Sequence, residues 1–145
     1  MQIGALIVAA GMSTRMGEFK PMLSIGSISV AQRVIATLSQ AGVEKILMVT
    51  GYNATILERH LAGNGIIFLR NEEYEKTQMF DSVKIGLEYL MDKCDKVLFT
   101  PVDVPLFTAK TVKTILDSDA PLAVPMCEGR QGHPILIANS LIPEI

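Results

Sequence analysis

The sequence predicts an α/β protein with a mostly parallel sheet and helices on both faces of that sheet. Short apolar runs alternate along the chain with segments whose apolar residues recur at helical spacing. The runs contain almost no polar residues, which is typical of strands covered on both faces. Strands that alternate with helices in this way favour parallel pairing.

The first strand is expected at residues 4–9, where GALIVA is an almost unbroken apolar run. Further runs of four to six residues have the same character, among them KILMVT, GIIFL and KVLFT. A fifth, short apolar run and a sixth run that begins with a proline complete the predicted strands. These later strands are expected at residues 45–50, 65–69, 96–100, 122–124 and 134–138.

The first helix is expected at residues 28–41, because its apolar residues fall on one helical face and Gly42 follows it. Asn53 can cap a short second helix. Residues 78–93 place apolar side chains at spacings of three and four, which indicates an amphipathic helix. Thr108 starts the last helix.

Composition bounds the class of protein. The chain has 145 residues, of which 49% are hydrophobic and 19% charged, as expected of one globular domain over residues 1–145. A net charge of −2 excludes the basic footprint of a protein that binds nucleic acid or an anionic membrane surface. No apolar run approaches the roughly 18 residues of a membrane span. Cys94 and Cys127 have no metal-ligand spacing and are expected to be reduced thiols of a cytoplasmic protein.

Ligands of open α/β sheets bind beyond the carboxyl ends of the strands. The segments that follow the predicted strands are therefore the place to look for chemistry. They are residues 10–20, 51–53, 71–74, 101–105 and 126–133.

The segment AAGMSTRMGEFK at residues 9–20 has the properties of an anion-binding loop. Gly11 and Gly17 allow the backbone to approach a ligand closely, and Arg15 and Lys20 add two positive charges. The small residues that leave room for phosphate oxygens are Ala9, Ala10 and Ser13. The spacing is neither that of a Walker loop nor GxGxxG. The alternative is a plain connection between a strand and a helix.

The segment PVDVP holds Asp103 between two prolines directly after the fourth strand. A rigid carboxylate at that place suits Mg²⁺, which is often bound by one or two carboxylates and substrate phosphates. The alternative is a turn aspartate that bonds to its own backbone.

Three other places carry polar residues of interest. In EGRQGHP, residues 128–134, two glycines bracket Arg130 and His133 precedes a proline; a surface hairpin would have the same pattern. Asn71 follows the third strand, where it can also cap or turn, and Ser82 can equally be a small residue on a helix face. His60 has no evident partner and is expected to be solvated.

The segment from Leu6 to Lys20 resembles the opening motif LAAGxSxRMGxxK of the MobA/MocA-like NTP transferases, which include the enzymes that attach CMP or GMP to molybdopterin. Every motif residue from Ala9 to Lys20 is in place. Asn71, Tyr74 and Ser82 are similar to the family's asparagine, aromatic residue and serine-bearing helix. Asp103 is similar to its aspartate between a strand and a proline, and residues 132–134 to the Gly-His-Pro of cytidylyl-type members.

The resemblance implies a Rossmann-like nucleotidyltransferase fold and a reaction in which CMP or another nucleoside monophosphate passes from an NTP to a phosphate-bearing acceptor such as molybdopterin. It implies that Gly11, Arg15 and Lys20 hold the triphosphate and that Asp103 binds Mg²⁺. Asn71 and Ser82 would lie near base and ribose, and His133 in the acceptor loop. The Ala-Ala-Gly start at residues 9–11 favours CTP over GTP.

Three features depart from the family pattern. Gln78 stands where the family has a glycine, and GSIS at residues 26–29 lacks the usual acceptor-loop pattern. Family members usually carry a second metal-binding aspartate some tens of residues further along. Near residue 145, Glu144 is the only acidic residue of the sequence. The chain is therefore expected to lack the usual C-terminal portion. Two alternatives stay open: a sugar-1-phosphate nucleotidyltransferase, and a nucleotide-binding regulatory module without catalysis.

Overall fold

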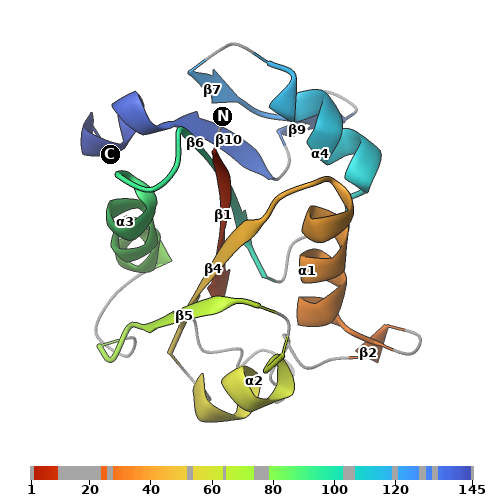
Figure 1. Ribbon diagram of the computed structural model, residues 1–145, viewed down its shortest axis with the longest axis vertical. Helices are drawn as coiled ribbons and strands as arrows, with labels where there is room; N and C mark the ends of the chain where they lie inside the picture. Colours follow the sequence, from red (N-terminus) through yellow and green to blue (C-terminus); the bar gives the residue numbers. More distant parts are fainter. Residues whose placement is uncertain are drawn as a thin grey trace.

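The computed structural model describes residues 2–9, 24–25, 28–51, 54–63, 65–73, 79–102, 107–118, 121–127, 130–131 and 134–144. Within this part of the chain, six strands form the main sheet in the order β5-β4-β1-β6-β10-β7 (Figure 1). Their bounds are β1 Ile3–Ala9, β4 Lys45–Thr50, β5 Ile67–Arg70, β6 Lys96–Pro101, β7 Leu122–Ala123 and β10 Ile135–Ala138.

The four strands β5, β4, β1 and β6 are parallel to one another. β10 is antiparallel to both of its neighbours, β6 and β7. The predicted, mostly parallel sheet is therefore confirmed, and each predicted strand is found within two residues of its expected bounds. Two short antiparallel pairs lie outside the main sheet. They are β2 Ser24–Ile25 with β3 Ile28–Ser29, and β8 Met126–Cys127 with β9 Arg130–Gln131.

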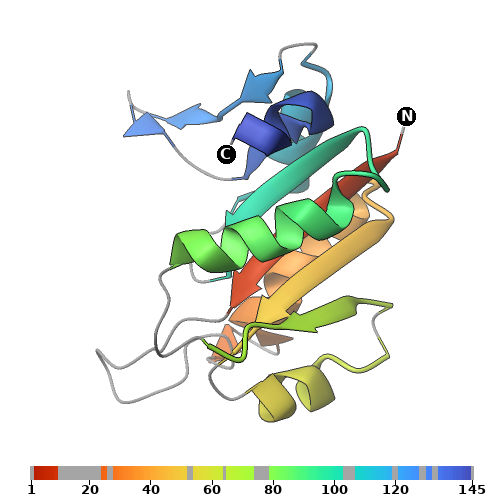
Figure 2. The same cartoon turned by 90° about the vertical axis from the view of Figure 1, so that its left-hand side faces the viewer.

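Helices cover both faces of the sheet, as predicted (Figures 1 and 2). Their bounds are α1 Val30–Gln40, α2 Ala54–His60, α3 Met79–Leu90 and α4 Ala109–Leu116, and a 3₁₀ helix, η2, follows at Asn139–Glu144. Residues alternate along β1: Ala5 and Ile7 join the core formed with α1, α2 and α4, whereas Leu6 and Val8 join the core formed with α3. None of these helices is long and apolar enough to cross a membrane.

α1 begins two residues later than predicted. Ser29 has extended dihedral angles, φ −83° and ψ 166°, and its side chain accepts a hydrogen bond from the backbone N–H of Gln32. The Gln32 side chain in turn accepts one from the backbone N–H of Ser29. This capping box sets the amino end of the helix. The two residues before Val30 instead pair with β2.

α3 lies directly against β1, and the glycine at position 86 allows this contact. A Cβ atom there would overlap the side chain of Leu6, which is fully buried. Because α3 returns along the sheet after β5, its first turn lies at the edge where the parallel strands end. The fold thereby brings the start of α3 to the edge at which the sequence predicts the site.

Candidate functional site

Four parallel strands end at one edge of the sheet. Their last residues are Ala9, Thr50, Arg70 and Pro101. In register, Thr50 lies between Ala9 on one side and Arg70 on the other. The backbone N–H of Val102 donates to the carbonyl oxygen of Val8 at 3.0 Å. Main-chain hydrogen bonding to β1 therefore continues one residue beyond the end of β6. The chain therefore leaves β1 after Ala9 and β6 after Pro101 at neighbouring points of this edge.

Asn71 and Ser82, two of the predicted site residues, are joined directly. Asn71 Nδ2 donates to Ser82 Oγ at 2.9 Å, and the two residues are 4% and 2% exposed. Asn71 Oδ1 accepts from the backbone N–H of Glu73 at 3.1 Å, which agrees with the alternative that Asn71 forms a turn. The backbone N–H of Asn71 also donates to Thr50 O at 2.7 Å. Asn71 thus connects the ends of β4 and β5 to the first turn of α3.

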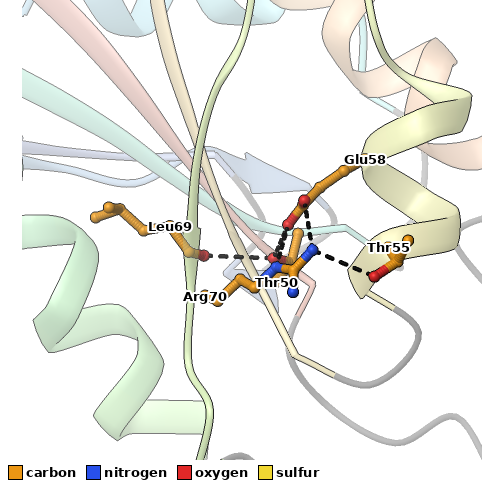
Figure 3. A network of polar contacts seen from close by, with 5 residues as sticks. All are labelled: Thr50, Thr55, Glu58, Leu69 and Arg70. Atoms are coloured by element: carbon orange, nitrogen blue, oxygen red, sulfur yellow. Dashed lines mark hydrogen bonds and ion pairs between the residues drawn. The ribbon is translucent and has the colours of Figure 1, made fainter.

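A second polar network surrounds the ends of β4 and β5 (Figure 3). Glu58 of α2 accepts three hydrogen bonds: from Thr50 Oγ1 at 2.9 Å, Arg70 Nε at 3.0 Å and Arg70 Nη2 at 3.0 Å. Arg70 Nη2 also donates to Thr55 Oγ1 at 3.2 Å. The Arg70 guanidinium, together with the Thr50 hydroxyl, lowers the pKa of the Glu58 carboxyl, although partial burial acts in the opposite direction.

Sequence reasoning missed this network. Glu58 and Arg70 belong to no motif and are twelve residues apart. The available signal is weak: an acid on the helix after one strand, and an arginine at the end of the next strand. Many surface residues share that pattern, and the sheet register is needed to show that they meet.

The prediction that His60 is solvated and without a partner is wrong. Its Nε2 atom lies 2.8 Å from Ser29 Oγ, and Ser29 is buried. The contact joins the end of α2 to the cap of α1 through two residues that are 31 positions apart in the sequence. Its role is structural, because it lies between two helix ends and not among the residues of the strand edge.

Ala9 ends β1 and is 4% exposed. The other predicted site residues lie outside the described part of the chain. They are Ala10, Gly11, Ser13, Arg15, Gly17, Lys20, Asp103 and His133. The hairpin interpretation of the segment around Arg130 agrees with the pairing of β8 and β9.

Among the residues that the structure describes, no group of three or more His, Cys, Asp and Glu side chains could hold a metal ion. Asp103, the predicted ligand of Mg²⁺, directly follows Val102, which is 4% exposed and hydrogen-bonded to β1. The lone described thiol, that of Cys94, is buried, and burial raises its pKa, so it is not a ready metal ligand or nucleophile.

Residues 5–145 match the family described as the MobA-like NTP transferase domain. The chain is 30% identical to the molybdenum cofactor cytidylyltransferase of Escherichia coli (strain K12) over 140 residues, which are 94% of this chain and 70% of that protein. It is 26% identical to the bifunctional protein GlmU of Staphylococcus epidermidis over 144 residues, or 98% of this chain. The chain spans only about 30% of the length of that second relative.

Solved structures share the fold. A nucleotidyl transferase from Methanothermobacter thermautotroptrophicus superposes with a TM-score of 0.86 at 21% identity, over 99% of this chain and 74% of that one. Rv0371c from Mycobacterium tuberculosis H37Rv, in complex with manganese, superposes with a TM-score of 0.81 at 20% identity over the same shares. The Rossmann-like nucleotidyltransferase fold predicted from the sequence is thereby confirmed.

Proposed function

We propose a function from one premise: this chain belongs to the family of MobA-like NTP transferase domains. It transfers a nucleoside monophosphate from an NTP to a phosphate-bearing acceptor and releases pyrophosphate. The family match over residues 5–145 carries the proposal. The arrangement of the strand edge supports it, because the loop at residues 9–20 and the segment with Asp103 begin on neighbouring strands.

We propose CTP as the nucleotide and molybdopterin as the first acceptor to test. The support for CTP is the Ala-Ala-Gly start at residues 9–11 and the 30% identity with a molybdenum cofactor cytidylyltransferase. That same relative is the reason to test molybdopterin. His133 would lie in the loop that contacts this acceptor.

In the proposed reaction, a phosphate oxygen of the acceptor attacks the α-phosphorus of the nucleotide in line. The bond to the bridging oxygen breaks, and that oxygen takes the electron pair into pyrophosphate. The attacking oxygen is already anionic near neutral pH, so no side-chain base is required. Arg15 and Lys20 would neutralise the charge that develops on the leaving phosphates. Mg²⁺ on Asp103 would supply further neutralisation when bound.

Asn71 and Ser82 would form the wall of the pocket near base and ribose. Their small exposed fractions, 4% and 2%, suit residues that hold the pocket's shape and present few atoms to a ligand. The hydrogen bond between them would hold the turn after β5 at a fixed distance from the first turn of α3.

A thermal-shift screen tests nucleotide binding. The purified chain is heated with CTP, GTP, UTP or ATP, each with and without MgCl₂. A ligand at about 100 times its Kd stabilises the folded state by roughly 2.7 kcal/mol, which is readily measured. The largest shift is expected with CTP and MgCl₂. No shift with any of the four would remove the basis of the proposal.

Replacement of Lys20 tests catalysis. Lys20→Ala is expected to lower kcat/KM by about 100-fold, because a cation aimed at developing charge contributes on the order of 3 kcal/mol. Lys113→Ala, on the exposed side of α4, is the matched control and should leave the rate unchanged. An unchanged kcat/KM for Lys20→Ala would contradict the assignment. Nucleotide binding without pyrophosphate release with any acceptor, sugar phosphates included, would instead favour a regulatory module.

A further inference from the structure

We propose that Glu58 is a positioning residue of the nucleotide site, because its carboxylate holds the ends of β4 and β5 together and thereby keeps Asn71 in place. The inference rests on the proposed function, in which Asn71 forms part of the nucleotide pocket. Glu58 itself belongs to α2 and would act through Thr50 and Arg70.

One carboxylate joins the last residues of two neighbouring strands. Its Oε2 atom accepts from Thr50 Oγ1 and from Arg70 Nε, and its Oε1 atom accepts from Arg70 Nη2. Thr50 and Arg70 are partners in the register of β4 and β5 (Figure 3). The guanidinium meets the carboxylate through two parallel bonds, a geometry that fixes direction as well as distance.

From these strand ends the contacts lead directly to Asn71. Arg70 precedes it in the chain, and Thr50 O accepts its backbone N–H at 2.7 Å. Asn71 then donates to Ser82 at 2.9 Å. A continuous set of short hydrogen bonds therefore connects α2, β4, β5 and α3 across the edge of the sheet.

β5 needs such support more than the central strands do. It is one of the two edge strands of the sheet, beside β4. It has four residues, three of them only partly buried and Arg70 exposed. Short edge strands with few buried contacts open locally more readily than the core. Without the carboxylate, the end of β5 would lose its side-chain connection to α2, while its main-chain pairing with β4 and the contacts of Asn71 with Ser82 and Glu73 would remain.

Global stability should depend little on this pair. The side chains of Arg70 and Glu58 are 47% and 21% exposed, and ion pairs with that much solvent contribute little to folding. Thr50, in contrast, is fully buried, and its hydroxyl lies 2.9 Å from Glu58 Oε2 and, at a longer distance of 3.4 Å, from the carbonyl oxygen of Leu69. The expected consequence of losing the network is local: a less ordered Asn71 within a chain that stays folded.

Four variants separate positioning from a general loss of structure. Glu58→Gln removes the charge that attracts Arg70. Thr50→Val removes the hydroxyl with little change of shape, whereas Thr50→Ser keeps the hydroxyl and removes only the methyl group. Asn139→Ala is the control, because it removes a side-chain hydrogen bond, to Cys94 O at 3.2 Å, at the opposite edge of the sheet.

The first measurement is calorimetric titration with CTP in the presence of MgCl₂, with the Tm of each variant recorded. Glu58→Gln is expected to bind CTP about tenfold more weakly, because a wall of the pocket that is ordered only on binding lowers the affinity. Thr50→Val should also bind more weakly, whereas Thr50→Ser and Asn139→Ala should bind as the unaltered chain does.

The second measurement is amide hydrogen exchange without nucleotide. Glu58→Gln should speed exchange in the peptide that covers residues 67–73 and leave the peptide of β6 unchanged. This result does not depend on CTP, so it detects the coupling between Glu58 and Asn71 by itself.

The outcomes distinguish the two proposals. If the unaltered chain binds CTP and Glu58→Gln binds it equally well, the inference is wrong and the proposed function stands. The inference is also wrong if Asn139→Ala weakens binding as much as Glu58→Gln does, or if exchange at residues 67–73 does not change. If the unaltered chain binds none of the four nucleoside triphosphates, the proposed function fails and the inference fails with it.

Discussion

Replacing Asn71 and Ser82 by alanine, singly and together, measures the hydrogen bond that joins the turn after β5 to α3. The bond is 2.9 Å long, and both residues are at most 4% exposed, so neither side chain can exchange its partner for bulk water. A hydrogen bond between neutral groups contributes about 1 kcal/mol net to folding. Ser82→Ala should therefore lower the free energy of unfolding by at least about 1 kcal/mol, because it takes the Ser82 acceptor from the buried Asn71 Nδ2.

Asn71→Ala should cost more, about 2 kcal/mol, because the bond to the Glu73 backbone N–H is lost as well. The double variant should cost little more than Asn71→Ala alone, since the shared bond can be lost only once. The coupling energy of the cycle is then about 1 kcal/mol.

Urea unfolding at neutral pH, followed by circular dichroism, supplies the four free energies if the slope m stays constant. A control cycle pairs Asn71→Ala with Ser140→Ala, an exposed residue of η2, and its effects should add. A coupling energy between Asn71 and Ser82 below about 0.3 kcal/mol would refute the reasoning, because distant and independent sites already vary by that amount.

Three further predictions concern the fold around the site. Gly86→Ala should lower the free energy of unfolding by about 1–3 kcal/mol in urea titrations, because its Cβ would overlap Leu6; an unchanged or higher midpoint would contradict that overlap. Ser29→Ala should cost about 1 kcal/mol through loss of the cap and of the His60 contact, and Ser29→Gly less; equal stability of all three chains would exclude the capping box. The folded-state pKa of Glu58 lies below its usual 4.5, so its stabilising effect is complete above that pH and is lost as the pH falls through the lowered pKa. Titration of the Glu58 carboxyl followed by NMR should show its pKa below that usual value in the unaltered chain and closer to it in Arg70→Ala, and an equal pKa in the two chains would argue against the ion pair.

The elements of the fold could be predicted closely because each depends on local pattern. Buried parallel strands require apolar residues on both faces, and β1 and β4 show that as uninterrupted runs. Helical periodicity located α3 and α4 in the same way. The start of α1 was misplaced by two residues because Ser29, an N-cap, has a side chain that competes for backbone hydrogen bonds, and periodicity does not register this.

The candidate site could be predicted in part. Asn71 follows a strand and Ser82 lies early in a helix, so both are expected at one edge of the sheet, and their direct contact agrees with that expectation. His60 was misjudged, since its partner is Ser29, 31 residues away. The loop at residues 9–20, Asp103 and His133 rest on the spacing of their motifs, and the experiments above test them.

The sequence by itself determined the alternation of strands and helices and the mostly parallel sheet, because hydrophobic periodicity and turn residues act over a few positions at a time. It also predicted the edge of the sheet at which to look for a site. Only the tertiary structure decided that β10 runs antiparallel beside β6, that Glu58 reaches Thr50 and Arg70, and that His60 reaches the cap of α1. Such contacts depend on strand order and register, which bring distant residues within hydrogen-bonding distance. The free energy that selects this strand order and register comes from burial of the whole core. The residue types at the positions that meet therefore do not reveal the contacts.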